Sequence, residues 1–261
     1  MTFYKWITST MDNPSKPGQW GPLHISVLVG AIAVIVALAL IFRKKSDKTK
    51  RIVAIVLASL ILLFEVTRRS VNIYKIVNGG DNSLDHWLYI LIPRPWCAIS
   101  CWTIILAAFV NKKFIYNIAS TTSLLCAIIF FAYPGAGFNN VYMEFENVYS
   151  IGTHTLLLIS SITFICLGLT EFRYKHIWKE AIYLVGIFLY AFFEMFALKI
   201  EDDPLYFMPG NDIQEIIGTS WGVYLVIYIV FILVYFNIFY LIGDRKTVFK
   251  KRNKKVEKSL N

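Results

Sequence analysis

Seven apolar stretches, each about long enough to cross a lipid bilayer, occupy most of this 261-residue chain. A membrane-spanning helix needs roughly 20 mostly apolar residues. These runs are too long and continuous for barrel strands, which alternate in polarity at every second residue. Only 16% of the residues are charged, well below the usual share in a soluble domain. The sequence therefore predicts an all-α, polytopic membrane bundle of about seven helices, at about residues 23–42, 52–74, 87–110, 114–132, 150–170, 181–199 and 220–242.

The lysines and arginines predict the orientation of this bundle. Six lie in the loop after the first span, two follow the third, three follow the fifth and eight follow the seventh. Together these are 19 of the 26 basic residues, all on one side, whereas the opposite loops at 142–149 and 201–215 are acidic and aromatic. Basic loops stay in the cytoplasm. We expect a cell-membrane protein with its N-terminus outside and its C-terminus in the cytoplasm.

The net charge of +9 is then a consequence of topology. Because the basic residues lie beside membrane spans, nucleic-acid binding is not expected, and membrane lipids are the expected partners. Contact of the basic tail with anionic lipid fits this arrangement better than nucleic-acid binding does. The oligomeric state is not predicted.

The chain divides into three predicted parts. Residues 1–22 form a short extracytoplasmic segment with three prolines and no apolar core, so no cleavable signal peptide is expected. Residues 23–243 form one seven-helix domain, and residues 244–261 form a basic cytoplasmic tail that we expect to be solvated and partly disordered. The spans show no convincing internal repeat, which weakens a transporter built from inverted repeats.

Ionisable side chains at membrane depth are costly and usually face the interior of a bundle. Glu65 is followed by Arg68 and Arg69 at i+3 and i+4, so one face of the second span carries an acid beside two bases. These residues either line an internal polar cavity or pair near the outer boundary, with the arginines extending to the headgroups. Glu194 in the sixth span precedes an acidic loop and either covers a cavity mouth or belongs to a solvated region.

The third span opens with Ile-Pro-Arg-Pro-Trp-Cys, ending at Cys97. Two prolines two residues apart cannot sit in an uninterrupted helix, whereas Pro95 suits the first position of one. Cys97 would then lie in a first helical turn, where the helix dipole and unpaired N–H groups stabilise a thiolate. The alternative is that Cys97 is simply a small apolar core residue, and the residue spacing alone favours that alternative.

Two histidines are expected near the outer side. His154 is predicted in the first turn of the fifth span, and His24 lies at the start of the first. Histidine can act as the general base for a nucleophile, although a lone histidine at a helix start more often makes structural hydrogen bonds. The four cysteines lie within spans without CxxC pairs or zinc-type spacing, so neither a metal nor a cofactor is expected.

The order of these residues resembles a known family. The features that carry the resemblance are Gly-Pro-Leu-His24, Glu65 followed by bases, Ile-Pro-x-x-x-Cys97, His154 opening a span, and a Tyr-Phe-Met-Pro loop before Gly218 and Trp221. In this order the chain looks like the YwaF-type bacterial membrane proteins, which are similar to the eukaryotic transmembrane protein 164 family.

That resemblance implies a multi-helix, lipid-modifying fold. Its eukaryotic members are described as acyltransferases that use a cysteine and a histidine, and more distant relatives are lipid hydrolases that use a threonine and a histidine. By resemblance, Cys97 would be the nucleophile and His154 its base. The family often has Leu-Pro-Leu-His-Leu-Cys, and Pro95 stands here in place of that histidine.

Three functions follow from these observations. The first is a lipid acyltransferase or hydrolase that uses Cys97 and His154. The second is a transporter or solute-binding membrane protein without covalent chemistry, whose pathway would be lined by Glu65, Arg68, Arg69 and Glu194. These four residues and His24 are the candidates for a substrate cavity. The third is a non-catalytic membrane scaffold.

Overall fold

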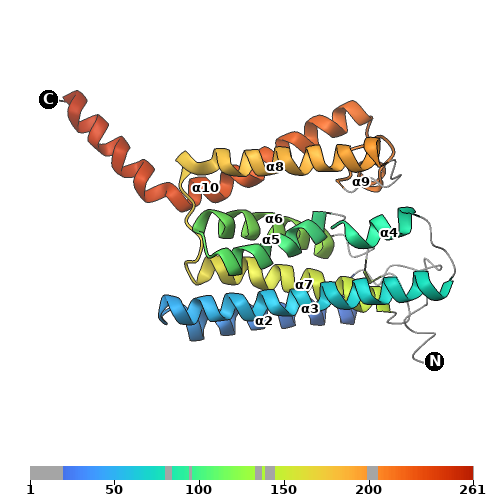
Figure 1. Ribbon diagram of the computed structural model, residues 1–261. Helices are drawn as coiled ribbons and strands as arrows, with labels where there is room; N and C mark the ends of the chain where they lie inside the picture. The colour runs from blue at the N-terminus through green and yellow to red at the C-terminus, as the bar shows by residue number, and fades with distance from the viewer. Residues whose placement is uncertain are drawn as a thin grey trace. The chain divides into compact units, whose positions relative to one another are not determined.

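The computed structural model describes residues 20–79, 84–93, 96–132, 137–138, 145–198 and 205–260, and its regular elements in these ranges are all helical (Figure 1). The chain forms two compact units, residues 1–170 and residues 171–261. The predicted single domain at 23–243 therefore contains parts of both units, and each is described separately.

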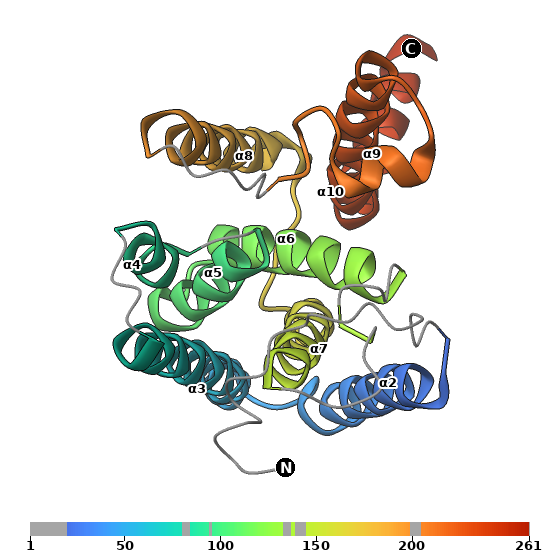
Figure 2. The same cartoon turned by 90° about the vertical axis from the view of Figure 1, so that its right-hand side faces the viewer.

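The first unit is a bundle built around one central helix. Its elements are α2 (Pro22–Phe42), α3 (Asp47–Gly79), α4 (Leu84–Leu91), α5 (Trp96–Val110), α6 (Lys113–Ala132) and α7 (Phe145–Cys166). Helix α7 packs against α2, α3, α5 and α6, and it lies in the middle of the unit in Figure 2. Side chains of α7 can therefore meet side chains from four other helices.

Small residues let these helices approach closely. Gly152 of α7 lies directly against Phe64 of α3, where an added Cβ would come within 2.3 Å of the phenyl ring. Ala107 and Ala108 of α5 and Ala119 of α6 are fully buried. Such residues are typical of membrane helix interfaces, where close backbone packing replaces the hydrophobic effect.

The second unit consists of η2 (Tyr174–His176), α8 (Ile177–Phe192), the π-helical turn η3 (Phe193–Ala197), α9 (Asp212–Ile217) and α10 (Trp221–Leu260). The loop at 205–210 is fastened to α10: the Trp221 indole donates a hydrogen bond to the Phe207 carbonyl at 3.0 Å, and the Tyr228 hydroxyl donates to the Leu205 carbonyl at 3.1 Å. The predicted Tyr-Phe-Met-Pro loop therefore packs on the start of the last helix.

Five helical segments are long and apolar enough to cross a membrane: Pro22–Phe42, Lys113–Ala132, Phe145–Cys166, Tyr174–Ala197 and Trp221–Asp244. They correspond to the first, fourth, fifth, sixth and seventh predicted spans. The chain is thus an integral, multi-pass membrane protein by helix length and hydropathy. The total of about seven spans and the orientation remain predictions.

The second and third predicted spans differ from simple apolar helices. Helix α3 runs for 33 residues, but Glu65, Arg68 and Arg69 interrupt its apolar stretch. The third span is divided: α4 ends at Leu91, and the 15-residue α5 begins at Trp96. Proline chemistry explains the division, because a proline removes a helical hydrogen bond and clashes with the preceding turn.

Several boundaries lie elsewhere than the sequence indicates. Helix α7 begins at Phe145, so residues 145–149 are helical where the sequence suggests a loop. His154 consequently lies in the third turn of its helix, and the expectation of a first-turn histidine was wrong. Helix α10 continues to Leu260, so the predicted tail is helical in the structure. Most of the predicted segment 1–22 lies outside the described residues.

Candidate functional site

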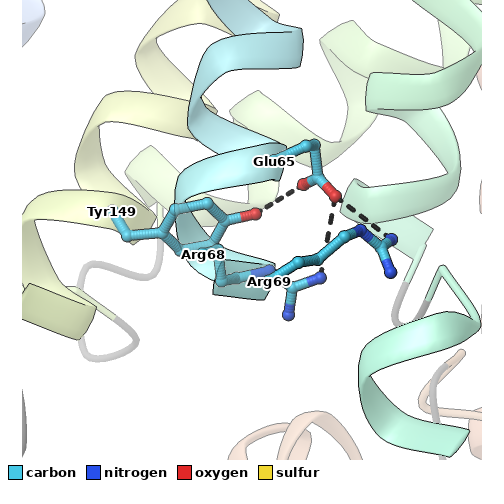
Figure 3. Close-up of polar contacts among 4 residues, drawn as sticks. All are labelled: Glu65, Arg68, Arg69 and Tyr149. Atoms are coloured by element: carbon cyan, nitrogen blue, oxygen red, sulfur yellow. Dashed lines mark hydrogen bonds and ion pairs between the residues drawn. The ribbon is translucent and has the colours of Figure 1, made fainter. Parts of the chain in front are cut away.

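A buried carboxylate, Glu65 of α3, is at the centre of a polar cluster in the first unit (Figure 3). Its side chain is completely inaccessible. The Tyr149 hydroxyl, from α7, donates a hydrogen bond to Oε1 of Glu65 at 2.6 Å. Nη2 of Arg69 donates to Oε2 at 3.3 Å, and Nη2 of Arg68 lies 3.7 Å from the same oxygen. Both carboxylate oxygens are therefore engaged by positive or donating groups.

The two arginines extend this cluster to neighbouring helices. The Arg68 guanidinium lies over the ring of Tyr149, 5.2 Å from its centroid, and the Arg69 guanidinium lies 5.6 Å from the ring centroid of Trp102 on α5. Cation–π contacts of this kind stabilise a charge that has lost its water. The i, i+3 and i+4 spacing places Glu65 and both arginines on one helical face, which α5 and α7 then enclose.

Cys97 lies near the start of α5, a helix that packs against α3, which carries this cluster. It is the second residue of that helix and is partly buried. Glu65 and Arg68 lie within electrostatic range of its sulfur. Residues 94 and 95 lie outside the described residues, so the expected place of Pro95 at the first helical position stays a prediction. The structure does place the helix start one residue before Cys97.

His154 is held by two contacts. Its Nδ1 lies 2.8 Å from the Ser150 carbonyl oxygen, and its ring stacks on Phe130 of α6 at a centroid distance of 3.9 Å. A carbonyl only accepts hydrogen bonds, so Nδ1 must carry the proton and Nε2 of the neutral ring is left as the basic nitrogen. Among the described residues, no hydrogen bond links Cys97 to His154. The pairing of Cys97 as nucleophile with His154 as its base, which the resemblance implies, stays a prediction.

His24 has a different environment. It is completely buried and lies against the rings of Trp20, Phe131 and Phe138, with centroid distances of 5.1, 5.8 and 4.7 Å. Its Nδ1 accepts a hydrogen bond from the main-chain N–H of Trp20 at 3.3 Å. Its Nε2 makes no hydrogen bond of good geometry, although the Phe131 carbonyl at the end of α6 is close. These contacts suit a structural histidine that joins α2 to α6.

Glu194 belongs to the second unit. It lies in the π-helical turn η3 at the end of α8 and is almost completely buried. Single π-helical turns inside helices occur frequently at functional sites. The structure brings Glu65, Arg68 and Arg69 into contact in the first unit, with Cys97 within electrostatic range of Glu65 and Arg68. Glu194 lies in the second unit, and His24 lies in a separate aromatic cluster.

Sequence reasoning missed three side chains of these environments: Tyr149, Trp102 and Phe130. Tyr149 falls in a segment that the sequence suggests is a loop, 84 residues from its partner Glu65. Only the helical pairing of α3 with α7 brings them together. Trp102 lies on the same helix as Cys97. Its contact with Arg69 results from the packing of α3 against α5, which the sequence does not indicate.

No group of three or more His, Cys, Asp or Glu side chains in the described ranges is arranged to hold a metal ion. The first unit contains a buried acid–base cluster, a thiol near a helix start, and a histidine whose Nδ1–H donates to a main-chain carbonyl.

These features define a multi-pass helical membrane protein with a polar interior. Residues 19–240 match the sequence model of the TMEM164 family, so the chain belongs to that family. No curated protein and no solved structure matches the chain. The finer placement among YwaF-type bacterial proteins remains a prediction.

Proposed function

We propose that this protein is a lipid acyltransferase or lipid hydrolase in which the Cys97 thiolate attacks a lipid ester. The observation that carries the proposal is the position of Cys97 in the first turn of α5, next to the Glu65–Arg68–Arg69 cluster. The family resemblance supplies the reaction class, and the local structure supplies a physical reason for reactivity at this particular thiol.

A thiolate is costly in an apolar interior, so it needs positive groups nearby. The start of α5 presents unpaired N–H groups and the positive end of the helix dipole. Arg68 adds a positive charge within electrostatic range of the sulfur, and the negative charge of Glu65 opposes it. The same N–H groups are suited to hold the oxyanion that forms when sulfur attacks a carbonyl carbon.

In this mechanism the sulfur forms a bond to the ester carbonyl carbon and the ester C–O bond breaks. His154 takes the thiol proton at Nε2 and returns it to the departing alkoxide. A second lipid hydroxyl or a water molecule then attacks the thioester carbonyl carbon while His154 takes its proton, the C–S bond breaks, and the proton returns to the Cys97 sulfur. Direct transfer requires the sulfur and Nε2 to come within hydrogen-bond reach, or to be joined by one water molecule, in the working state.

Cysteine labelling in membranes tests this proposal. A thiol probe with an acyl-like chain should label Cys97 faster than Cys101 and Cys126, which are buried, and faster than Cys166, which is exposed. Cys166 is the informative control because access alone would favour it. His154→Ala should slow the labelling of Cys97 and leave Cys166 unchanged. Equal labelling of Cys97 and Cys166, or no effect of the histidine, would contradict the mechanism.

A second candidate function is the binding or transport of a solute without covalent chemistry. The buried Glu65–Arg68–Arg69–Tyr149 cluster favours it, because such groups mark ion and substrate pathways in membrane proteins. Under this alternative, Glu65→Gln would abolish uptake or binding, and Cys97→Ala would have no effect on either.

The proposed setting is the cell membrane, with the C-terminus in the cytoplasm and the eight basic residues that follow Asp244 near anionic lipid. A reporter that is active only outside the cytoplasm should be inactive when fused after Asn261. Activity of that reporter would show that the C-terminus lies outside the cytoplasm, which contradicts the proposed orientation.

A further inference from the structure

The interface between α6 and α7 contains an unusual set of buried hydroxyl groups. Two stripes with the same helical spacing contribute to it, Tyr116-Ser120-Ser123-Ala127-Phe130 on α6 and Thr153-Leu157-Ser160-Phe164 on α7. The stripes are anchored to each other at both ends. Tyr116 contacts Phe164 edge-on at a centroid distance of 5.0 Å, and Phe130 stacks on His154 beside Thr153.

The hydroxyls between these two anchors have no partner. Those of Tyr116, Ser120, Ser123, Ser160 and Thr163 make no hydrogen bond, and each of these residues is at most 1% exposed. A buried hydroxyl without a partner is destabilising, since it has given up its bonds to water.

Neighbouring residues on the same helices show that this is not a general property of the segment. Thr122 donates to the Ile118 carbonyl at 2.7 Å, and Ser161 donates to the Leu158 carbonyl at 3.0 Å. Serine and threonine hydroxyls in helices commonly donate a hydrogen bond to a main-chain carbonyl in the preceding turn. The hydroxyls of Tyr116, Ser120, Ser123, Thr153 and Ser160 on the facing stripes lack such a bond, as do those of Thr155 and Thr163 elsewhere on α7.

We propose that a row of ordered water molecules occupies the α6–α7 interface and bridges these hydroxyls. A buried water typically makes two to four hydrogen bonds to groups that would otherwise be unsatisfied. Ser120, Ser123 and Ser160 supply donors and acceptors from both helices.

The position of the row suggests where water enters and what it reaches. Tyr116, at one end, lies within electrostatic range of Arg51, which is exposed on the side of the basic loop. The other end reaches the level of the Phe130–His154 pair. Supply of water to His154 rests on the proposed function, whereas the presence of the water row does not.

Hydroxyl-radical footprinting by X-ray irradiation tests the row, because radicals made from bound water modify the side chains that touch it. Tyr116 and Tyr224 are a matched pair: both are 1% exposed, but the Tyr224 hydroxyl donates to the Tyr206 carbonyl. Tyr116 should be modified several-fold faster than Tyr224. Equal rates would overturn the proposal and leave the serines as residues for close helix packing.

A second comparison uses adjacent serines of α7. Ser160→Ala should reduce the modification of Tyr116, whereas Ser161→Ala, which removes an equally buried but satisfied hydroxyl, should not. If both variants leave Tyr116 unchanged, the row is absent. Neither measurement involves Cys97 or a lipid, so the proposed acyl chemistry can fail while the row remains, and the reverse.

Discussion

Helices α6 and α10 are both candidate membrane spans, but they differ in how much of each is buried by other helices. In α6, 72% of the most apolar stretch is buried inside the protein, whereas the corresponding share for α10 is 17%. Helix α10 is nevertheless the more apolar of the two. A helix that faces lipid must be apolar around most of its surface, while a helix enclosed by other helices can carry polar groups. The less apolar spans are therefore the places to look for function.

The largest effect is expected at the enclosed acid. Glu65→Ala would leave Arg68 and Arg69 buried without their shared carboxylate, and we expect a loss of about 3–5 kcal/mol in the free energy of unfolding. Thermal unfolding in detergent measures it. The control is Glu146→Ala, which removes a partly exposed ion pair with Lys75 and should cost about 0–1 kcal/mol. Equal stabilities of the two variants would show that the interior of the first unit tolerates free charge.

A leucine in each of the two helices tests the contrast directly. Leu125 of α6 is 1% exposed and Leu233 of α10 is 57% exposed. Leu125→Ala should leave a cavity and cost about 2–5 kcal/mol. Leu233→Ala should cost little, because lipid chains are as apolar as leucine and fill the space. If Leu233→Ala were as costly, α10 would be covered by protein.

Close packing of α7 can be tested with glycines. Gly152→Ala would push a Cβ into the ring of Phe64 and should destabilise the first unit by about 1–3 kcal/mol. Gly186→Ala in α8 meets nothing within 4 Å and should be neutral or slightly stabilising. The same measurement serves both variants. A harmless Gly152→Ala would mean that α3 and α7 are less closely packed than described.

The smallest effect is expected from a single hydroxyl. Tyr149→Phe keeps the ring beneath Arg68 and removes only the donor to Oε1 of Glu65, at a cost of about 1.5 kcal/mol. In the Glu65→Ala background the same change should have much less effect, because the acceptor is gone. An unchanged cost in that background would show that the hydroxyl acts through another partner.

The sequence indicates some of these features and conceals others for physical reasons. Uninterrupted apolar runs indicate the helices at Pro22–Phe42 and Lys113–Ala132 closely, and prolines indicate the break before Cys97. The early start of α7 was hidden because polar and aromatic residues begin the helix at Phe145. Fixed helical spacing places Glu65 beside its arginines, but no local pattern points to Tyr149. Local sequence patterns do not indicate contacts between residues that lie far apart in the sequence and meet only through helix packing.

The length of α3 can be compared with the thickness of a bilayer to place Glu65 along the membrane normal. Its 33 residues extend about 50 Å, whereas the hydrocarbon core measures about 30 Å. If α3 spans the membrane as the sequence predicts, with Arg51 at one boundary, then Glu65 lies about 21 Å further along the axis and closer to the opposite boundary than to the first. In that arrangement the helix would continue past the second boundary to Gly79. A reactive thiol beside Glu65 would consequently sample the lipids of one leaflet, the leaflet opposite the basic loops, and be out of reach of the other.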